Sequence, residues 1–213
     1  MLELRRRERA LLFGAVGANT LFYTGARIVN GNRECICLST ARDDAIPFLP
    51  WTILVYWGLA LVLWGSGYHL AAKQDKAEAN RFFLAHLLGE GVCFLCFVLF
   101  PTTLERPDVT INGPFSWMVQ LTYVLDRPDN LLPSIHCFVS WLCHLGVRDN
   151  SKVPLWYRRL SFLSAAVVCV STLTVKQHVL ADAAAGIVLA QVSFWAAGHF
   201  VRIRERLEKN TAS

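Results

Sequence analysis

Six apolar stretches constrain this chain more than any other feature of its sequence. A helix crosses the hydrocarbon core of a bilayer with roughly 20 mainly apolar residues, and the stretches have about that length: 10–29, 48–71, 82–101, 132–147, 156–175 and 179–201. Only 17% of the 213 residues are charged, whereas soluble domains carry about 25%. The sequence therefore predicts an all-α fold in which residues 1–213 form a single membrane domain of six transmembrane helices.

The first stretch is the weakest of the six, because Asn19, Thr20 and Arg27 interrupt it. Its basic start and small residues also fit a signal peptide. Apolar residues continue as far as Val29, which favours a helix that is retained in the protein.

Basic residues are unevenly distributed over the segments between these stretches. Fifteen of the 21 Lys and Arg residues fall on the side that holds both chain ends. Because loops rich in Lys and Arg stay in the cytoplasm, we expect a multi-pass membrane protein with both termini cytoplasmic. The net charge of +5 then reflects topology and contact with anionic membrane lipids, and no nucleic-acid partner is expected.

Three polar segments fall together on the opposite, extracytoplasmic side. They read PTTLERPD at 101–108, DRPDNLLPSIHC at 126–137 and STLTVKQHVLAD at 171–182. Polar and ionisable groups at membrane depth are costly and mark functional sites by default. Glu90, an isolated carboxylate in the third apolar stretch, is expected instead to face the bundle interior as a helix contact.

The third polar segment holds His178 and Asp182, which are four residues apart. On a helix they lie one above the other, so the carboxylate can accept one imidazole N–H and leave the other ring nitrogen free as nucleophile or base. Lys176 adds a cation nearby. The alternative is an ordinary helix start, in which Asp182 favours the positive end of the helix dipole.

The second segment combines a helix start with two residues that a helix start does not explain. Pro133 suits a first helical turn, and Asp129 or Asn130 is expected to cap it. A helix N-terminus binds phosphate readily. The Ser134 hydroxyl can add a donor there, and His136 can exchange a proton with a bound oxygen.

Arg106, in the first polar segment, carries a planar guanidinium that suits phosphate. The alternative is a solvated loop arginine paired with Glu105 or Asp108. Taken together, the three segments offer a set of groups for phosphoryl transfer through a phosphohistidine. The set lacks the carboxylate clusters of di-metal hydrolases, so neither a metal nor another cofactor is expected.

These motifs resemble those of the type 2 phosphatidic acid phosphatase superfamily, over about residues 48–200. The dipeptide Arg106–Pro107 is similar to the end of the first family motif, PSIH at 133–136 to the second, and S-x6-H-x3-D at 171–182 to the third. The surrounding pattern is most similar to the branch that includes inositol phosphorylceramide synthase-like proteins. The resemblance implies the six-helix fold of the membrane members.

The resemblance also implies roles for individual residues. His178 would be the nucleophile on phosphorus and Asp182 its orienting partner. His136 would protonate the leaving alkoxide and then act as base on the incoming water or alcohol. Arg106, Ser134 and the backbone N–H groups near Ile135 would hold the phosphate.

The chain departs from the family pattern at three positions. Leu99 stands where the first motif usually has Lys, Thr172 where the third usually has Arg, and Ile135 where the second commonly has Gly. Lys176 is the first candidate to replace a missing cation. The remaining candidates for the phosphate site are Arg127, Asn130 and Asp126.

Three functions remain open on the sequence. The first is a membrane phosphohydrolase that removes phosphate from a lipid phosphate or diphosphate at the extracytoplasmic face. The second is a lipid phosphotransferase, which would use the same phosphohistidine but pass the group to an alcohol. The third, motivated by Leu99 and Thr172, is a non-catalytic lipid-binding or transport relative. The sequence does not indicate an oligomeric state.

Overall fold

The computed structural model describes residues 5–31 and 33–211, and these are predominantly helical. The all-α prediction is confirmed. The helices are α1 (Arg6–Asn30), α2 (Ala41–Asp44), α3 (Ala60–Ala72), α4 (Lys76–Leu99), α5 (Pro114–Leu125), α6 (Ile135–Arg148), α7 (Leu155–Thr174) and α8 (Leu180–Thr211). A 3₁₀ turn, η1 (Pro50–Thr52), and a π-helical segment, η2 (Val55–Leu59), lead into α3, and two short strands, β1 (Ile36–Cys37) and β2 (Thr102–Thr103), pair in parallel.

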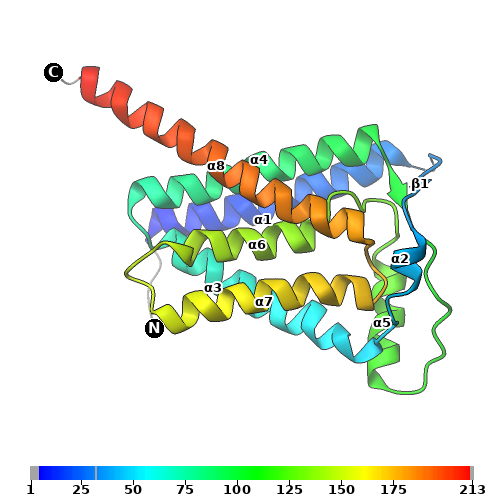
Figure 1. The fold of residues 1–213 in the computed structure, drawn as a ribbon. Coiled ribbons are helices and arrows are strands. Elements are labelled where there is room, and N and C mark those ends of the chain that lie inside the picture. Colours follow the sequence, from blue (N-terminus) through cyan, green and yellow to red (C-terminus); the bar gives the residue numbers. More distant parts are fainter. Residues whose placement is uncertain (1–4, 32, 212–213) are drawn as a thin grey trace.

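The long helices form one bundle with roughly aligned axes, and both chain ends lie at the same end of it (Figure 1). Each predicted apolar stretch coincides with one of these helices. Three helical segments are long and apolar enough to cross a membrane: Pro50–Ala72, Lys76–Leu99 and Leu180–Thr211. Within the described ranges α1, α6 and α7 fall short of that combination of length and hydropathy, and α6 has only 14 residues.

The core of the bundle lies between α4, α6 and α8, where large rings pack against small residues. Phe82 and Phe138 are buried. A Cβ on Gly89 would meet the Phe138 ring at 2.1 Å, and one on Gly146 would meet the Phe82 ring at 2.6 Å. These glycines therefore let the helices approach more closely than any larger residue would allow. Glu90 faces the interior as expected, and its Oε1 accepts a hydrogen bond from Asn19 Nδ2 at 2.9 Å.

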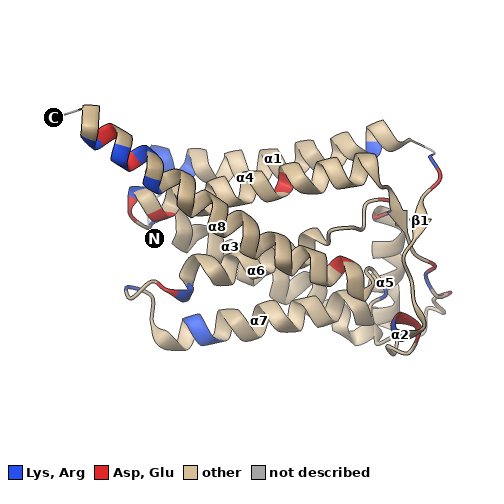
Figure 2. Ribbon diagram, turned by 45° about the horizontal axis from the view of Figure 1, so that its top comes forward, with Lys and Arg blue, Asp and Glu red and all other residues tan. Residues whose placement is uncertain are grey.

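Short elements close the end of the bundle away from the termini, and the sequence did not predict them. Helix α5 runs across the bundle helices at this end, with α2 and the β1–β2 pair beside it (Figure 1). With 12 residues α5 is too short to cross a bilayer. Basic residues gather at the opposite end, around both termini (Figure 2), which is the asymmetry on which the predicted orientation depends.

Candidate active site

A tight turn between α7 and α8 presents His178. Helix α7 ends at Thr174, and Lys176 has a positive φ of 54°, which few non-glycine residues adopt. The backbone N–H groups of Gln177 and His178 both donate to the Thr172 carbonyl, at 3.0 and 3.1 Å. These two hydrogen bonds fold the chain back, so that His178 lies directly before the first turn of α8.

Asp182 orients the His178 ring as its spacing predicted. Its Oδ2 lies 3.3 Å from His178 Nδ1 and accepts a hydrogen bond from Val179 N at 3.0 Å. Because a carboxylate oxygen can only accept, Nδ1 carries the proton in this pair. The other ring nitrogen, Nε2, makes no hydrogen bond with any residue that the structure describes, and it is the nitrogen available for attack.

Ser134 caps α6 and places His136 at the second position of the helix. The Ser134 Oγ accepts a hydrogen bond from Cys137 N at 3.4 Å. The expectation that Asp129 or Asn130 caps this helix is therefore wrong, and so is the inference that a helix start leaves Ser134 unexplained. The helix begins at Ile135, too far along the chain from Asp129 and Asn130 for either side chain to cap it.

Close contact between α6 and α8 brings the two histidines together. Ser134 N donates to the Asp182 carbonyl at 3.0 Å, and a Cβ on Gly186 would meet the Ser134 carbonyl oxygen at 2.5 Å. Only glycine fits there, because backbone stands in the way. The ring centroids of His136 and His178 are 6.3 Å apart and the ring planes are tilted by 54°.

Two aromatic residues that the sequence analysis did not single out hold His136. The Tyr56 ring stacks on it with centroids 4.3 Å apart, and the Tyr56 hydroxyl lies 3.4 Å from His136 Nδ1. The centroid of the Trp64 ring lies 5.2 Å from that of the His136 ring. Tyr56 belongs to the π-helical segment η2, a feature that often marks functional sites. Nothing in the sequence distinguishes these two residues from other aromatics in an apolar helix.

Arg106 is held at the carboxyl end of α5 rather than paired with Glu105 or Asp108. Its Nη1 donates to the Asp126 carbonyl at 2.7 Å and the Tyr123 carbonyl at 3.3 Å, and its Nη2 donates to Gln177 Oε1 at 2.6 Å. The negative end of a helix favours a cation. Partial burial lowers the pKa of Arg106, and its Nε is buried without a partner among the described residues.

Lys176 points to α2. Its Nζ donates to the Asp43 carbonyl at 2.7 Å, while Asp43 Oδ1 accepts from Leu180 N at 2.7 Å and so caps α8. Burial alone would raise the pKa of Asp43, but hydrogen bonds from Thr40 and Leu180 outweigh it and hold that pKa below its usual range. Asp43 thus positions the turn that carries His178. It lies 137 residues before Leu180, so no local pattern could reveal it.

The other candidates for the phosphate site make structural contacts. Asp126 accepts a hydrogen bond from the Tyr23 hydroxyl and lies 3.6 Å from Arg27 Nη1. Asn130 accepts one from Asn30 at 3.2 Å. The exposed Arg127 pairs with Asp129 at 3.3 Å; it lines neither of the two cavities described below.

Leu99 and Thr172, the two positions at which the motifs of the resemblance usually carry a cation, differ in their surroundings. Leu99 is 61% exposed at the end of α4. The Thr172 hydroxyl donates to the Cys169 carbonyl at 2.7 Å inside α7. The same hydroxyl lies 3.7 Å from Cys137 Sγ, and neither Leu99 nor Thr172 lines either of the two cavities described below.

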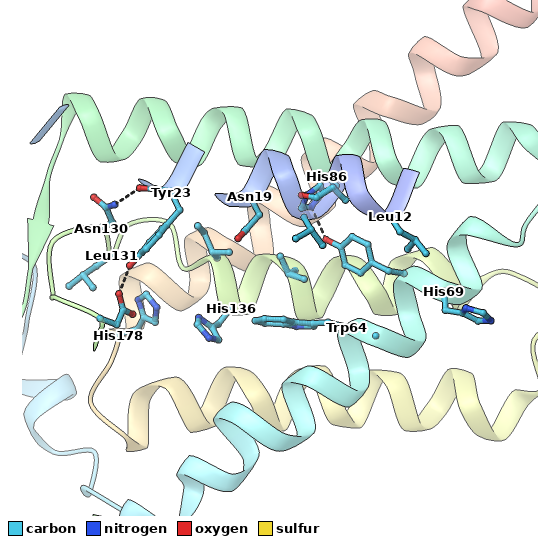
Figure 3. Close-up of a pocket in the computed structure, with 17 residues that line it drawn as sticks. Leu12, Asn19, Tyr23, Trp64, His69, His86, Asn130, Leu131, His136 and His178 are labelled. Atoms are coloured by element: carbon cyan, nitrogen blue, oxygen red, sulfur yellow. Dashed lines mark hydrogen bonds between the residues drawn. The ribbon is translucent and has the colours of Figure 1, made fainter. Parts of the chain in front are cut away.

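His178 lies between two cavities. One, of about 570 Å³, is lined mainly by apolar residues and contains His136, Asp126 and Asn130 as well (Figure 3). The other, of about 470 Å³, is called the polar cavity because its lining is the more polar of the two; it lies beside α2, with Arg106 and Lys176 in its wall. A group bound at His178 can therefore be reached from an apolar side and from a polar side.

Chemically, the arrangement combines an imidazole whose Nδ1 is hydrogen-bonded to a carboxylate with a second imidazole whose ring centroid lies 6.3 Å away. In residues 5–31 and 33–211 no group of three His, Cys, Asp or Glu side chains is arranged to hold a metal ion. No family model, no curated protein and no solved structure matches the chain.

Proposed function

We propose that this chain is a membrane phosphohydrolase that removes phosphate from a lipid phosphate or diphosphate. The observation that carries the proposal is the pair of imidazoles with centroids 6.3 Å apart, one of them hydrogen-bonded to Asp182 at 3.3 Å. In this proposal α1, α6 and α7 join the three longer apolar helices to make six spans, with both termini cytoplasmic and the site at the extracytoplasmic face. This is the arrangement that the resemblance to type 2 phosphatidic acid phosphatases implies.

The reaction proceeds in two steps. In the first, His178 Nε2 forms a bond to phosphorus and the P–O bond to the leaving oxygen breaks; this oxygen belongs to the alcohol of a lipid phosphate or to the inner phosphate of a diphosphate. His136, protonated at the start, gives its proton to that oxygen. In the second, His136 takes a proton from water, the water oxygen bonds to phosphorus, and the N–P bond breaks to release phosphate. Asp182 keeps Nε2 free in the resting state and stabilises the charge that develops on the ring.

Arg106 and the first N–H groups of α6 hold the phosphoryl oxygens in this scheme. The guanidinium is fixed by three acceptors, so little side-chain freedom is lost when it binds an anion. The start of a helix adds N–H donors and a partial positive charge. Lys176 contributes charge from the wall of the polar cavity.

The test is phosphate release from a panel of lipid phosphates by purified wild type, His178→Ala and His199→Ala. His199 is exposed on α8, about five helical turns beyond Leu180, so its removal controls for general effects of losing an imidazole. We expect release by wild type and His199→Ala and none by His178→Ala. A wild type that is inactive on the whole panel, or an active His178→Ala, would refute the proposal.

A second candidate is transfer of the group to an alcohol instead of water. The polar cavity of about 470 Å³ beside His178 favours it, because that space can admit an acceptor larger than water. Lipid donor labelled in the transferred group, incubated with a water-soluble alcohol, distinguishes the two. A labelled alcohol ester would establish transfer, and free phosphate alone would exclude it for that acceptor.

A further inference from the structure

The apolar cavity at His178 extends far into the bundle. It runs from His136 and His178 between α1, α3 and α6 to Leu12 and His69, near the end that holds the termini (Figure 3). Five of its residues lie on one face of α1, from Leu12 to Tyr23. At 1.5 Å per residue, that face is about 16 Å long. The cavity is therefore elongated, with one end at the two histidines, and could hold an extended chain.

The polar groups along the middle of the cavity, Tyr68, His86 and Asn19, already have hydrogen-bond partners. The Tyr68 hydroxyl lies 2.8 Å from His86 Nδ1, and His86 Nε2 lies 3.2 Å from the Ala15 carbonyl. Asn19 donates to Glu90. Between the polar residues near His178 at one end and His69 at the other, the wall also includes the apolar residues Leu12, Val16, Trp64, Ile135 and Val139. An occupant without polar groups matches such a wall, because it leaves none of these hydrogen bonds broken.

The cavity opens on the flank of the bundle between α1 and α3. Val16 on α1 lines the cavity and is 66% exposed, and Gly65 on α3 lines it opposite and is also exposed. A Cβ on Gly65 would meet nothing within 4 Å. The opening faces the side on which a membrane-spanning bundle meets lipid.

We propose that this cavity binds the hydrocarbon chain of the substrate, which passes between α1 and α3 and lies along α1 with its phosphate at His178. The proposal rests on the proposed function and specifies its substrate as a phosphate ester of a long, unsubstituted chain. Helix α1 lies outside residues 48–200, the part of the chain that carries the family resemblance. The proposed role of α1 in binding the hydrocarbon chain therefore rests on the residues of α1 that line the cavity and not on the family resemblance.

The test uses water-soluble alkyl phosphates from ethyl to octyl, each below its aggregation concentration. The protein is held in an amphipathic polymer, because detergent tails would compete for the cavity. Burial of one CH2 is worth about fourfold in binding, or roughly 0.8 kcal/mol. We expect kcat/KM of the wild type to rise about fourfold with each added CH2.

Gly65→Leu is expected to remove this chain-length dependence. Its side chain fills open space at the opening, and leucine favours a helix more than glycine does, so the variant should fold. We expect ethyl phosphate to be turned over within about twofold of wild type and octyl phosphate at least about tenfold more slowly. Gly91→Leu is the matched control, because a Cβ there also meets nothing within 4 Å and the residue lines neither cavity.

Binding separates failure of this inference from failure of the proposed function. Octyl phosphate should raise the unfolding temperature of wild type and Gly91→Leu more than that of Gly65→Leu, with or without turnover. A flat chain-length profile in wild type, or equal losses on ethyl and octyl phosphate in Gly65→Leu, overturns the cavity assignment. Inactivity on every alkyl phosphate combined with this pattern of stabilisation would leave the chain-binding site standing and overturn the phosphohydrolase.

Discussion

Replacing Asp182 with Asn tests the centre of the proposed mechanism. The substitution keeps the size of the side chain and an oxygen that can accept from Val179 N, but it removes the negative charge 3.3 Å from His178 Nδ1. At an effective dielectric constant of about 20, opposite unit charges at that distance attract by about 5 kcal/mol. That energy applies when His178 becomes positively charged during phosphoryl transfer. At about 1.4 kcal/mol per tenfold change in rate, we expect kcat to fall by about 10²- to 10⁴-fold.

The assay is phosphate release at saturating substrate, with thermal unfolding measured alongside. Asp149→Asn is the control, since it is the same substitution at an exposed carboxylate paired with Arg148 at the other end of the bundle. Because the two residues act as one unit, His178→Ala combined with Asp182→Asn should be no slower than His178→Ala alone. If Asp182→Asn kept more than a third of the wild-type kcat, the assigned role of the carboxylate would be wrong.

Three further substitutions probe the elements that build the site. Gly186→Ala puts a methyl group against the Ser134 carbonyl and should cost about 1–3 kcal/mol of unfolding free energy, with a loss of activity as α8 moves from α6. Asp43→Asn removes the charge that caps Leu180 and should cost about 1 kcal/mol. Because the pKa of Asp43 is lowered on folding, the ionised carboxylate stabilises the folded state above pH about 4, and this stabilisation is lost on acidification. The Asp43→Asn variant should therefore lose less unfolding free energy than wild type as the pH falls. Arg106→Lys keeps the positive charge but loses the planar guanidinium with its paired N–H donors, and inhibition by inorganic phosphate should weaken about tenfold or more.

Each of these predictions has its own contradicting result. Gly91→Ala should leave the unfolding temperature unchanged or raise it, since its Cβ has open space, and equal behaviour of the two alanine variants would contradict the close approach of α6 and α8. An acid unfolding profile of Asp43→Asn that parallels wild type would exclude the cap. Unchanged phosphate inhibition in Arg106→Lys would place the phosphate elsewhere.

The local features of the site were predictable because they depend on short spacings. His178 and Asp182 lie four residues apart, and their contact follows from a single helical turn. The contact of Tyr56 with His136 spans 80 residues, and the cap from Asp43 spans 137. Helix α5 was missed for a different reason: its 12 residues form an apolar run too short to count as a membrane span, so only its packing across the bundle reveals it.

The sequence by itself determined that this chain is helical and strongly apolar, and it located two histidines and a carboxylate in polar segments at one end. Hydropathy and residue spacing suffice for that, because they act over a few turns of helix. Only the tertiary structure decided that His136 and His178 face one another, that Lys176 turns to α2, and that an apolar cavity leads from the histidines along α1. Those facts depend on how closely helices distant in sequence can pack, and at Gly186 that distance is set by the absence of a single methyl group.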